Sequence, residues 1–167
     1  AAGLLVRRGL RFRLHLVGRD TDAPHVARRI AAHHADHAVR ALGPRDDVAN
    51  LLAGADAFVL STHREVFSVA ALEAMAAGLP LITTDIDAFD EMFDHDAEGL
   101  KTRAGDAADL AAAIERVATD PARRARLAAA ARRRAERFDA ANTVRGFRRL
   151  LRRLARPART APTHRRP

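Results

Sequence analysis

The chain of 167 residues lacks cysteine, tryptophan and tyrosine, and aromatic residues make up only 4% of it. Without cysteine it has no disulfide, no thiolate metal site and no cysteine nucleophile, which fits the reducing cytoplasm in which we expect it. No run of about 18 apolar residues occurs, so a membrane-spanning helix is excluded. At 48% hydrophobic residues the chain is nevertheless apolar enough to fold.

Lysine is also nearly absent, and the positive charge comes from arginine gathered at one end. The formal net charge is +8, yet residues 1–120 carry 13 Lys and Arg against 19 Asp and Glu. Residues 121–167 carry 16 Arg against two acids, Glu136 and Asp139. The chain is therefore a mildly acidic body with a basic C-terminal quarter. Because aromatic residues for stacking on bases are missing, nucleic acid is not an expected partner.

Short apolar runs alternate with helical stretches up to about residue 118. The runs predict strands at Phe12–Val17, His37–Leu42, Ala57–Leu60, Leu79–Thr83 and Gly99–Thr102. Between them, the pattern predicts helices at Ala23–Ala35, Asp46–Ala53, Val66–Ala77 and Asp87–Phe93. Strands separated by helices of about ten residues are typical of right-handed βαβ units. We therefore predict an α/β fold, a Rossmann-like parallel sheet of about five strands with helices on both faces.

Three further helices are expected after the last strand, at Asp106–Ala118, Pro121–Phe138 and Ala140–Ala155. Asp120 and Pro121 form a typical helix start, with Asp as the N-cap and Pro in the first helical position. Three prolines and scattered arginines then predict a disordered basic tail at residues 157–167. The sequence thus indicates one domain over residues 1–156.

The most informative stretch is residues 60–83, where a strand, a loop and a helix follow one another. The loop Ser61–Glu65 lies at the carboxyl end of a predicted parallel strand, which is where ligands bind in open α/β sheets. We expect the helix to open near Val66–Ser68. Its free amides would then point into the crevice and favour a phosphate or diphosphate, from Val66, Phe67, Ser68 and Val69. The alternative for Ser68 is a simple helix cap.

Glu73 is the only charged residue between Glu65 and Asp85, and its helix is otherwise apolar. Such a helix is expected to be buried nearly all round, so the carboxylate needs a cation, a backbone group or a ligand as partner. Glu65 and Glu73 would lie about 12 Å apart along the helix axis and face one cleft, as the sugar and the ribose of a nucleotide sugar require. The alternatives are a solvated or capping Glu65 and a Glu73 paired with an arginine.

Residues 65–80, E-V-F-S-V-A-A-L-E-A-M-A-A-G-L-P, resemble the E-x7-E segment of retaining glycosyltransferases of the family 4 type, which have the two-domain GT-B fold. The resemblance covers about residues 5–150 and includes Leu16-Val17-Gly18, Ala55–Ser61, Gly99-Leu100 and Gly105-Asp106. It implies the C-terminal, donor-binding half of a glycosyltransferase. Such an enzyme moves a sugar from a nucleotide-diphosphate sugar to an acceptor with retention, in glycan, glycolipid or cell-envelope polysaccharide synthesis.

The resemblance also implies roles for individual residues. Glu65 would be the catalytic residue that contacts the donor sugar near the reacting centre, and Glu73 would accept hydrogen bonds from the ribose diol. The amides of Val66, Phe67, Ser68 and Val69 would hold sugar hydroxyls and phosphate. Gly18 would let the backbone approach the diphosphate, and the backbone near Arg40 would read the nucleobase. No metal or other cofactor is usual for this fold, and we expect none.

Departures from the family pattern bear on activity. Val66 stands where the family has a glycine, and Asp87 and Ala88 replace the glycine pair before Glu91. The family's diphosphate-gripping Arg and Lys, and its acceptor-binding N-terminal domain, precede the matched region and are not in this sequence. We therefore expect residues 1–167 alone to be inactive in sugar transfer, with the missing half as their partner.

Two other patterns leave alternatives open. In the last helix, four arginines flank leucines, namely Arg148, Arg149, Arg152 and Arg153 around Leu150, Leu151 and Leu154. This basic amphipathic pattern suits docking on anionic lipid at the inner face of a membrane, and a solvated face is the alternative. The chain would then be a basic docking module, or a non-catalytic nucleotide-binding remnant, instead of an enzyme. A metal at His33, His34 and His37 is not expected, because histidine suits the end of a surface helix.

Overall fold

The computed structural model describes residues 1–155, so the predicted tail at residues 157–167 lies outside the described residues. The chain divides into two units, the first spanning Ala1–Glu136 and the second beginning at Arg137. The predicted domain 1–156 is therefore divided at Glu136. All strands described below belong to the first unit.

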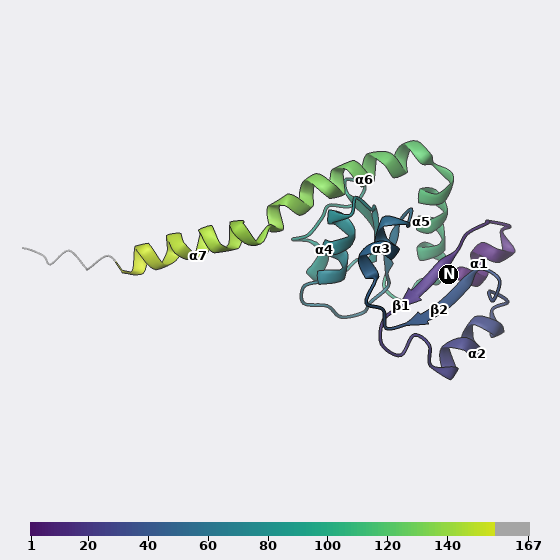
Figure 1. The fold of residues 1–167 in the computed structure, drawn as a ribbon. Helices are drawn as coiled ribbons and strands as arrows, with labels where there is room; N and C mark the ends of the chain where they lie inside the picture. Colours follow the sequence, from purple (N-terminus) through teal and green to yellow (C-terminus); the bar gives the residue numbers. More distant parts are fainter. Residues whose placement is uncertain (156–167) are drawn as a thin grey trace, which may run out of the picture. The chain divides into compact units, whose positions relative to one another are not determined.

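The first unit contains five short strands, of which Figure 1 labels β1 and β2. They are β1 (Leu14–Val17), β2 (Val39–Gly43), β3 (Phe58–Leu60), β4 (Leu81–Thr84) and β5 (Gly99–Thr102). Each lies within three residues of the bounds that the apolar runs predicted. The α/β, Rossmann-like fold class is thereby confirmed.

The strands form two separate hydrogen-bonded ladders and not the one continuous sheet that we expected. β1 pairs with β2, and β3, β4 and β5 pair in that order, all parallel. Among the described residues, β1 and β3 each pair with one strand only. This explains why the apolar β3 stays half-buried while β4, with a strand on each side, is buried along its whole length.

Helices precede or follow each strand. In the first unit they are α1 (Ala2–Arg7), α2 (Pro24–Ala32), α3 (Val48–Ala53), α4 (Val69–Ala76), α5 (Ala107–Thr119) and α6 (Pro121–Ala135). A 3-10 turn, η2 (Glu136–Phe138), follows α6, and α7 (Ala140–Leu154) belongs to the second unit. The sequence pattern predicts no helix at α1, because six residues are too few for a clear helical period.

One predicted helix is much shorter than expected. Residues 87–93 form only the 3-10 turn η1 (Asp87–Phe89), followed by a hydrogen-bonded turn. Three apolar side chains of this segment, Phe89, Met92 and Phe93, are completely buried. Packing of these side chains into the core, and not helix periodicity, therefore decides the path of the segment.

The core lies on both faces of the β3–β4–β5 ladder. Leu81 of β4 packs in a cluster with α4, η1 and the end of α6, which includes Met75, Phe89 and Ala131. The next residue, Ile82, packs on the other face with α5 and the middle of α6. Gly99 allows β5 to approach closely, since a Cβ there would lie 2.4 Å from the carbonyl oxygen of Leu81.

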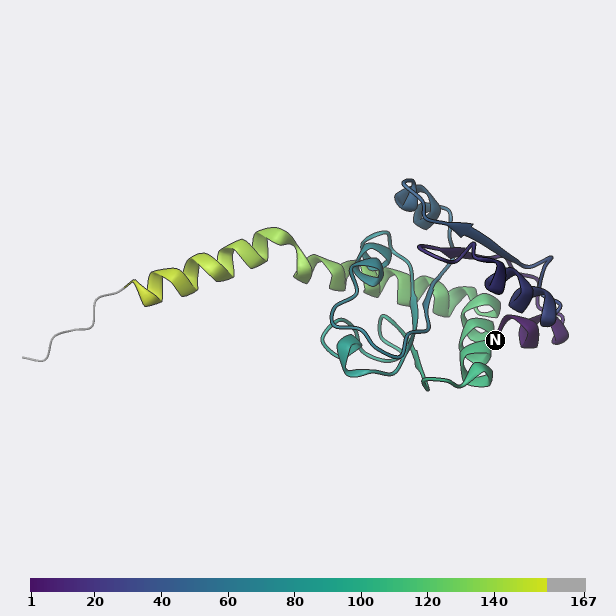
Figure 2. The same ribbon diagram turned by 90° about the horizontal axis from the view of Figure 1, so that it is seen from below.

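The β1–β2 ladder is attached to the rest of the unit through helix contacts. α1 packs against α5, and Arg8 Nη1 lies 2.7 Å from Glu115 Oε2 in an exposed ion pair. Figure 2 shows the purple and blue N-terminal segment beside the green helices that follow β5. Within the described residues, no helix combines the length and the apolarity that crossing a bilayer would require.

Candidate functional site

Hydrogen bonds connect the chain segments at the carboxyl ends of β3, β4 and β5. The hydroxyl of Thr84, the last residue of β4, donates a hydrogen bond to the carbonyl oxygen of Thr62 in the loop after β3. The amide of Asp85 donates to the carbonyl of Thr102 at the end of β5, with N···O 2.7 Å. His63 lies 3.7 Å from the place where a Cβ on Gly105 would stand. Parallel strands gather these loops at one edge, as the sequence predicted for a ligand crevice.

Glu65 lies at this edge and is exposed. Its carboxylate oxygen Oε1 accepts a hydrogen bond from the amide of Val66 at 3.0 Å. The Val66 amide, predicted as a donor toward a ligand, is therefore bonded to Glu65 in this structure. The other carboxylate oxygen of Glu65 remains available to a partner from solvent.

Exposed apolar side chains follow Glu65 along the chain. Val66, Phe67 and Val69 are 93%, 41% and 60% exposed. Exposure of three large apolar side chains over four residues is unusual on the surface of a folded unit, and such patches mark interaction sites. The sequence predicted the amides of this segment as functional but gave no role to its side chains.

The helix after the loop begins at Val69, directly after the predicted opening near Val66–Ser68 and three residues later than the predicted bound of the helix Val66–Ala77. Ser68 is its N-cap, with extended backbone angles and a side-chain oxygen that accepts from the amide of Ala71 at 3.2 Å. Serine in this position fixes the first turn, which is the simple capping role that the sequence left open. The first-turn amides that the helix leaves without an internal acceptor are consequently those of Val69 and Ala70.

Glu73 is exposed, and the prediction of a buried carboxylate is wrong. α4 buries only Ala71, Ala74 and Met75, while Glu73 lies on the opposite side. Alanine is apolar but small, so a face of alanines around one glutamate can remain in solvent at little free-energy cost. The carboxylate of Glu73 makes no hydrogen bond or ion pair with a described residue, so the arginine partner considered above is not found among the described residues.

The expected spacing between Glu65 and Glu73 does not apply either. The estimate of about 12 Å assumed a continuous helix from one to the other, at about 1.5 Å per residue. Glu65 instead lies in the loop, four residues before the first helical residue. Val69 and Glu73, four residues apart, do share one exposed face of α4. That face connects the start of the helix to Glu73.

Gly18 lies at the carboxyl end of β1, as predicted. Its φ of +129° belongs to a region that favours glycine, and a Cβ there would meet no atom within 4 Å. The turn is fixed by Thr21, whose hydroxyl donates to the Gly18 carbonyl at 2.9 Å and accepts from the Gly43 amide at 3.1 Å. Open space beside the Gly18 backbone is compatible with close approach of a ligand.

Arg40 lies away from the other predicted residues. It is the second residue of β2 and pairs in register with His15 of β1. Together with Arg13 and His37 these exposed side chains line a hollow near the amino ends of the two strands. Glu65, Ser68 and Gly18 lie at or beyond the carboxyl ends of their strands. The structure thus separates Arg40 from the loops that carry the other candidates, and its role in reading a base stays a prediction.

The histidines considered for a metal lie beyond the end of a helix. α2 ends at Ala32, His33 is its C-cap, and His34 has a φ of +54°. His33 and His37 are four residues apart but lie beyond the end of the helix, so they do not share a helical face. Among the described residues, no group of three or more His, Cys, Asp or Glu is arranged to hold a metal ion.

Asp106 ends the loop after β5 and caps α5. Hydrogen bonds from the backbone amides of Asp109 and Ala108, each 2.9 Å long, lower the pKa of its carboxyl group, and Arg103 adds to the effect. Asp120 caps α6 in the same way, and the amide of Arg123 is the main cause of its lowered pKa. Both caps fix the first turns of helices that pack against the β3–β4–β5 ladder.

Comparison with known proteins identifies the family. Residues 1–120 match the sequence profile described as "Glycosyl transferases group 1". The chain belongs to the group 1 glycosyltransferases. The resemblance drawn from the E-x7-E segment is thereby confirmed at the level of this family.

Individual relatives agree with the assignment. The glycogen synthase of Mycobacterium tuberculosis is 38% identical over 123 residues, which are 72% of this chain and 30% of the relative. The D-inositol 3-phosphate glycosyltransferase of Saccharomonospora viridis is 34% identical over 149 residues, 83% of this chain and 35% of the relative. The chain thus spans about a third of the length of these relatives.

Comparison with solved structures supports the same family. The structure of Anabaena Alr3699/HepE in complex with UDP matches with a TM-score of 0.78 and 26% identity, over 84% of this chain and 41% of that chain. The same protein has also been solved in complex with UDP-glucose. The first unit of this group 1 glycosyltransferase therefore has the Rossmann-like architecture of a GT-B domain.

Proposed function

We propose that this chain is the donor-binding part of a retaining glycosyltransferase of the family 4 type that uses a nucleotide-diphosphate sugar. The observation that carries the proposal is the loop containing Glu65, which is tied to β4 through Thr84 and leads directly into the N-terminus of α4. Its relatives are named as sugar transferases, and the similar HepE binds UDP and UDP-glucose. A glycan, glycolipid or envelope polysaccharide is the proposed product class.

The diphosphate is proposed to lie at the start of α4. The amides of Val69 and Ala70 and the positive end of the helix dipole favour negative charge there. Ser68 holds this turn rigid through its cap and so acts as a positioning residue. Glu73 lies on the same exposed helix face as Val69 and is free to accept hydrogen bonds from the ribose hydroxyls.

Glu65 is proposed to contact the donor sugar near its anomeric carbon, and Gly18 to allow the diphosphate close to the end of β1. In the reaction, the bond from the anomeric carbon to the diphosphate oxygen breaks, and a bond to the acceptor oxygen forms on the same face. The acceptor proton passes to the departing diphosphate oxygen. The chain's contribution is to position the donor and to stabilise charge on the leaving group, and the proposal assigns no metal to this step.

Because the chain spans about a third of its relatives' length, sugar transfer is proposed to require an acceptor-binding half. Residues 1–167 alone should therefore bind a nucleotide diphosphate but transfer no sugar. Measurable transfer by the purified chain would contradict this part of the proposal without affecting the donor site.

Thermal unfolding of purified 1–167 tests the donor site. UDP and UDP-glucose, or another nucleoside diphosphate, should raise the melting temperature, because a ligand that binds only the folded state stabilises it. Glu73→Ala should remove most of this shift, and Glu115→Ala, which removes a half-exposed glutamate of α5 that pairs with Arg8, should retain it. If no nucleoside diphosphate changes the melting temperature at millimolar concentration, the donor site is wrong.

A further inference from the structure

A basic hollow lies on the exposed face of the β1–β2 ladder, near the amino ends of both strands. Its volume is about 420 Å³, and its lining residues are Arg13, His15, His37, Ala38 and Arg40. This volume falls within the range of small-molecule sites, and no carboxylate of the described residues lines it. Gly18 follows the opposite, carboxyl end of β1, so the basic hollow is separate from the proposed donor site.

Strand pairing brings two of the lining side chains side by side. His15 pairs in register with Arg40, and paired residues on neighbouring strands, about 4.8 Å apart, point to the same face of a sheet. Both residues are exposed, whereas Leu14 and Val39, which alternate with them, are half-buried and buried. The ladder therefore holds an imidazole and a guanidinium next to each other on its open face.

The turn before β2 adds His37 to the basic hollow. Within this turn the amides of Ala38 and Val39 both donate to the carbonyl oxygen of Ala35, at 2.9 Å and 2.8 Å. Ala35 and Ala38 are buried, so the turn is packed against the core. His37 is consequently held in place by its hydrogen-bonded neighbours before any ligand arrives.

The cationic groups of the basic hollow have no acidic partner. Among residues 1–155, neither Arg13 nor Arg40 forms an ion pair or a side-chain hydrogen bond. By contrast, Arg45, two residues beyond the end of β2, meets Asp47 at 2.7 Å. Two guanidinium groups without counter-charges repel each other across one hollow, and an anion from solvent would remove this repulsion.

We propose that the basic hollow binds a small molecule through a phosphate monoester group. A monoester carries about 1.5 to 2 negative charges at pH 7, which the two guanidinium groups of Arg13 and Arg40 neutralise. Its remaining oxygens accept from the imidazole N–H groups of His15 and His37. A phosphodiester, as in a nucleic acid or a phospholipid headgroup, carries a single charge and balances only one of the two arginines.

This site goes beyond the donor site and does not depend on it. The basic hollow uses the side chain of Arg40, whereas the nucleobase prediction concerns the backbone near that residue. The two assignments are therefore separate, and either one can be wrong without the other.

The acceptor-binding half in the proposed function would leave the basic hollow open. That half must face the carboxyl ends of the strands, where the donor is proposed to lie, and the basic hollow is near the amino ends. A segment that pairs with the free edge of β1 would extend the ladder in its own plane. The face that carries His15 and Arg40 would stay uncovered in both cases.

Amide NMR of residues 1–167 tests the site residue by residue. Glucose 6-phosphate, added at constant ionic strength, should shift the amide signals of the four basic residues in the lining, and inorganic phosphate should shift the same signals. The diester dimethyl phosphate should bind about tenfold more weakly, because it lacks the second charge. Signals of Val69 and Ala70 report on the proposed diphosphate position, so failure of one site is distinguishable from failure of the other.

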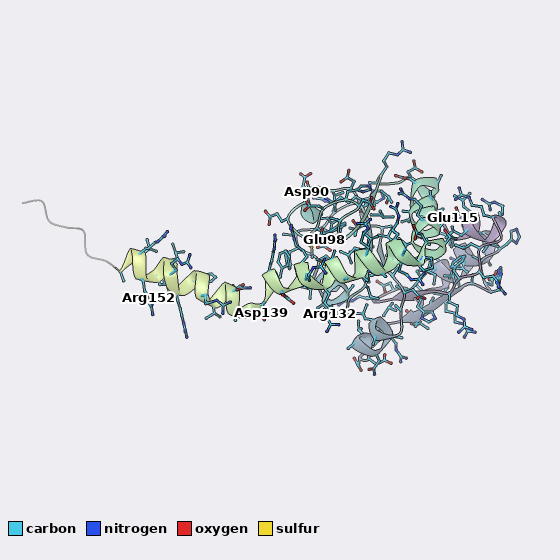
Figure 3. The ribbon with its side chains drawn as sticks, turned by 90° about the horizontal axis from the view of Figure 1, so that it is seen from above. Asp90, Glu98, Glu115, Arg132, Asp139 and Arg152 are labelled. Carbon is cyan, nitrogen blue, oxygen red and sulfur yellow. The ribbon has the colours of Figure 1, made fainter. Side chains whose placement is uncertain are left out.

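Substitution of the two arginines tests the charge argument. Arg13→Gln with Arg40→Gln should weaken binding of glucose 6-phosphate about tenfold or more, because charge-assisted hydrogen bonds are lost. The matched control is Arg132→Gln with Arg133→Gln on α6, where Figure 3 shows Arg132, and it should bind as the wild type does. All four side chains are exposed, and the dispersion of the amide signals verifies that each variant is folded.

Three outcomes with residues 1–167 would overturn the site. They are shifts without preference for the basic hollow, equal affinity for glucose 6-phosphate and dimethyl phosphate, and unchanged affinity of the Arg13 and Arg40 variant. A further measurement uses a longer polypeptide in which an acceptor-binding half precedes the chain. The affinity for glucose 6-phosphate should be the same there, and loss of binding would overturn the site by assigning the basic hollow to contact with that half.

Discussion

The Thr84 hydroxyl, at the end of β4, donates to the carbonyl oxygen of Thr62 in the loop that leads to Glu65. Thr84 is only 4% exposed, so the bond lies in a protected environment and joins the core of the ladder to an exposed loop. Thr62 in turn folds the loop on itself, since its hydroxyl donates to the Arg64 carbonyl at 2.8 Å and accepts from the Arg64 amide at 3.2 Å. The position of Glu65 therefore depends on a buried residue one strand away.

Replacing Thr84 by valine should loosen this loop. The change keeps the shape and removes the donor, and it should lower the free energy of unfolding by about 1 kcal/mol. The effect on binding should be larger, because the loop that carries Glu65 loses its connection to β4. Denaturant unfolding and calorimetry with UDP-glucose measure the two effects. Thr119→Val, which removes an exposed hydroxyl bonded within α5, serves as the control for the hydroxyl itself.

Removing the cap of α4 should destabilise the helix that carries Glu73. Ser68→Ala leaves the Ala71 amide without its acceptor and should lower the free energy of unfolding by about 1 kcal/mol. Ser68→Thr should recover part of the loss, whereas Ser61→Ala, in the exposed loop, should change little. A Ser68→Ala chain with unchanged chemical denaturation would show that the cap contributes nothing.

Acid should weaken the first unit through its aspartate caps. The pKa values of Asp106 and Asp120 are lowered in the folded state, chiefly by backbone amide hydrogen bonds. Their contribution is therefore fully present above the unfolded pKa of about 4 and is lost as the pH falls through the lowered folded values. Asp106→Asn with Asp120→Asn keeps capping side chains but removes this titration. Urea midpoints between about pH 5 and pH 2 should fall less steeply in this variant than in the wild type or in Asp36→Asn.

β1 and β3 each have one edge without a partner strand among the described residues, and amide hydrogen exchange should reveal these edges. Leu14 and Phe58 donate toward β2 and β4, so by alternation the amides of His15 and Val59 point to the sides without a strand among the described residues. These two amides should exchange much faster than the amide of Ile82, because β4 lies between two partner strands, β3 and β5. Equal protection of Val59 and Ile82 would show that another segment covers the β3 edge.

Local signals in the sequence were sufficient to locate most elements. The strands ending at Gly18 and at Ser61 were found from apolar runs bounded by turn residues, and α6 from its Asp120-Pro121 start. The helix end before Gly78 was equally clear. Errors arose where packing overrides local pattern, as in residues 87–93, whose phenylalanines enter the core and leave only a 3-10 turn. Likewise, because the Ser68 side chain accepts from the Ala71 amide, α4 starts at Val69, three residues after the predicted bound at Val66.

The candidate site was predicted less well than the fold. Glu65 and Gly18 lie at carboxyl ends of strands as expected, because strand order along the chain determines that edge. Burial of Glu73 could not be read from its neighbours, since an alanine-rich helix looks apolar all round whether or not a second layer covers it. The sequence does not predict the hydrogen bond between Thr84 and Thr62, because the two residues are 22 positions apart and belong to no common motif.

The sequence by itself determined the βαβ order, the family through the spacing of Glu65, Glu73 and Gly78, and the charge division between body and C-terminal helices. These are properties of residues that lie close together in the sequence, and hydrophobic periodicity and short motifs are sufficient to predict them. The tertiary structure alone decided that Glu73 is exposed, that Arg40 lies apart from Glu65, and that the strands form two ladders. Each of these depends on which surfaces meet across long sequence separations, and no local pattern contains that information.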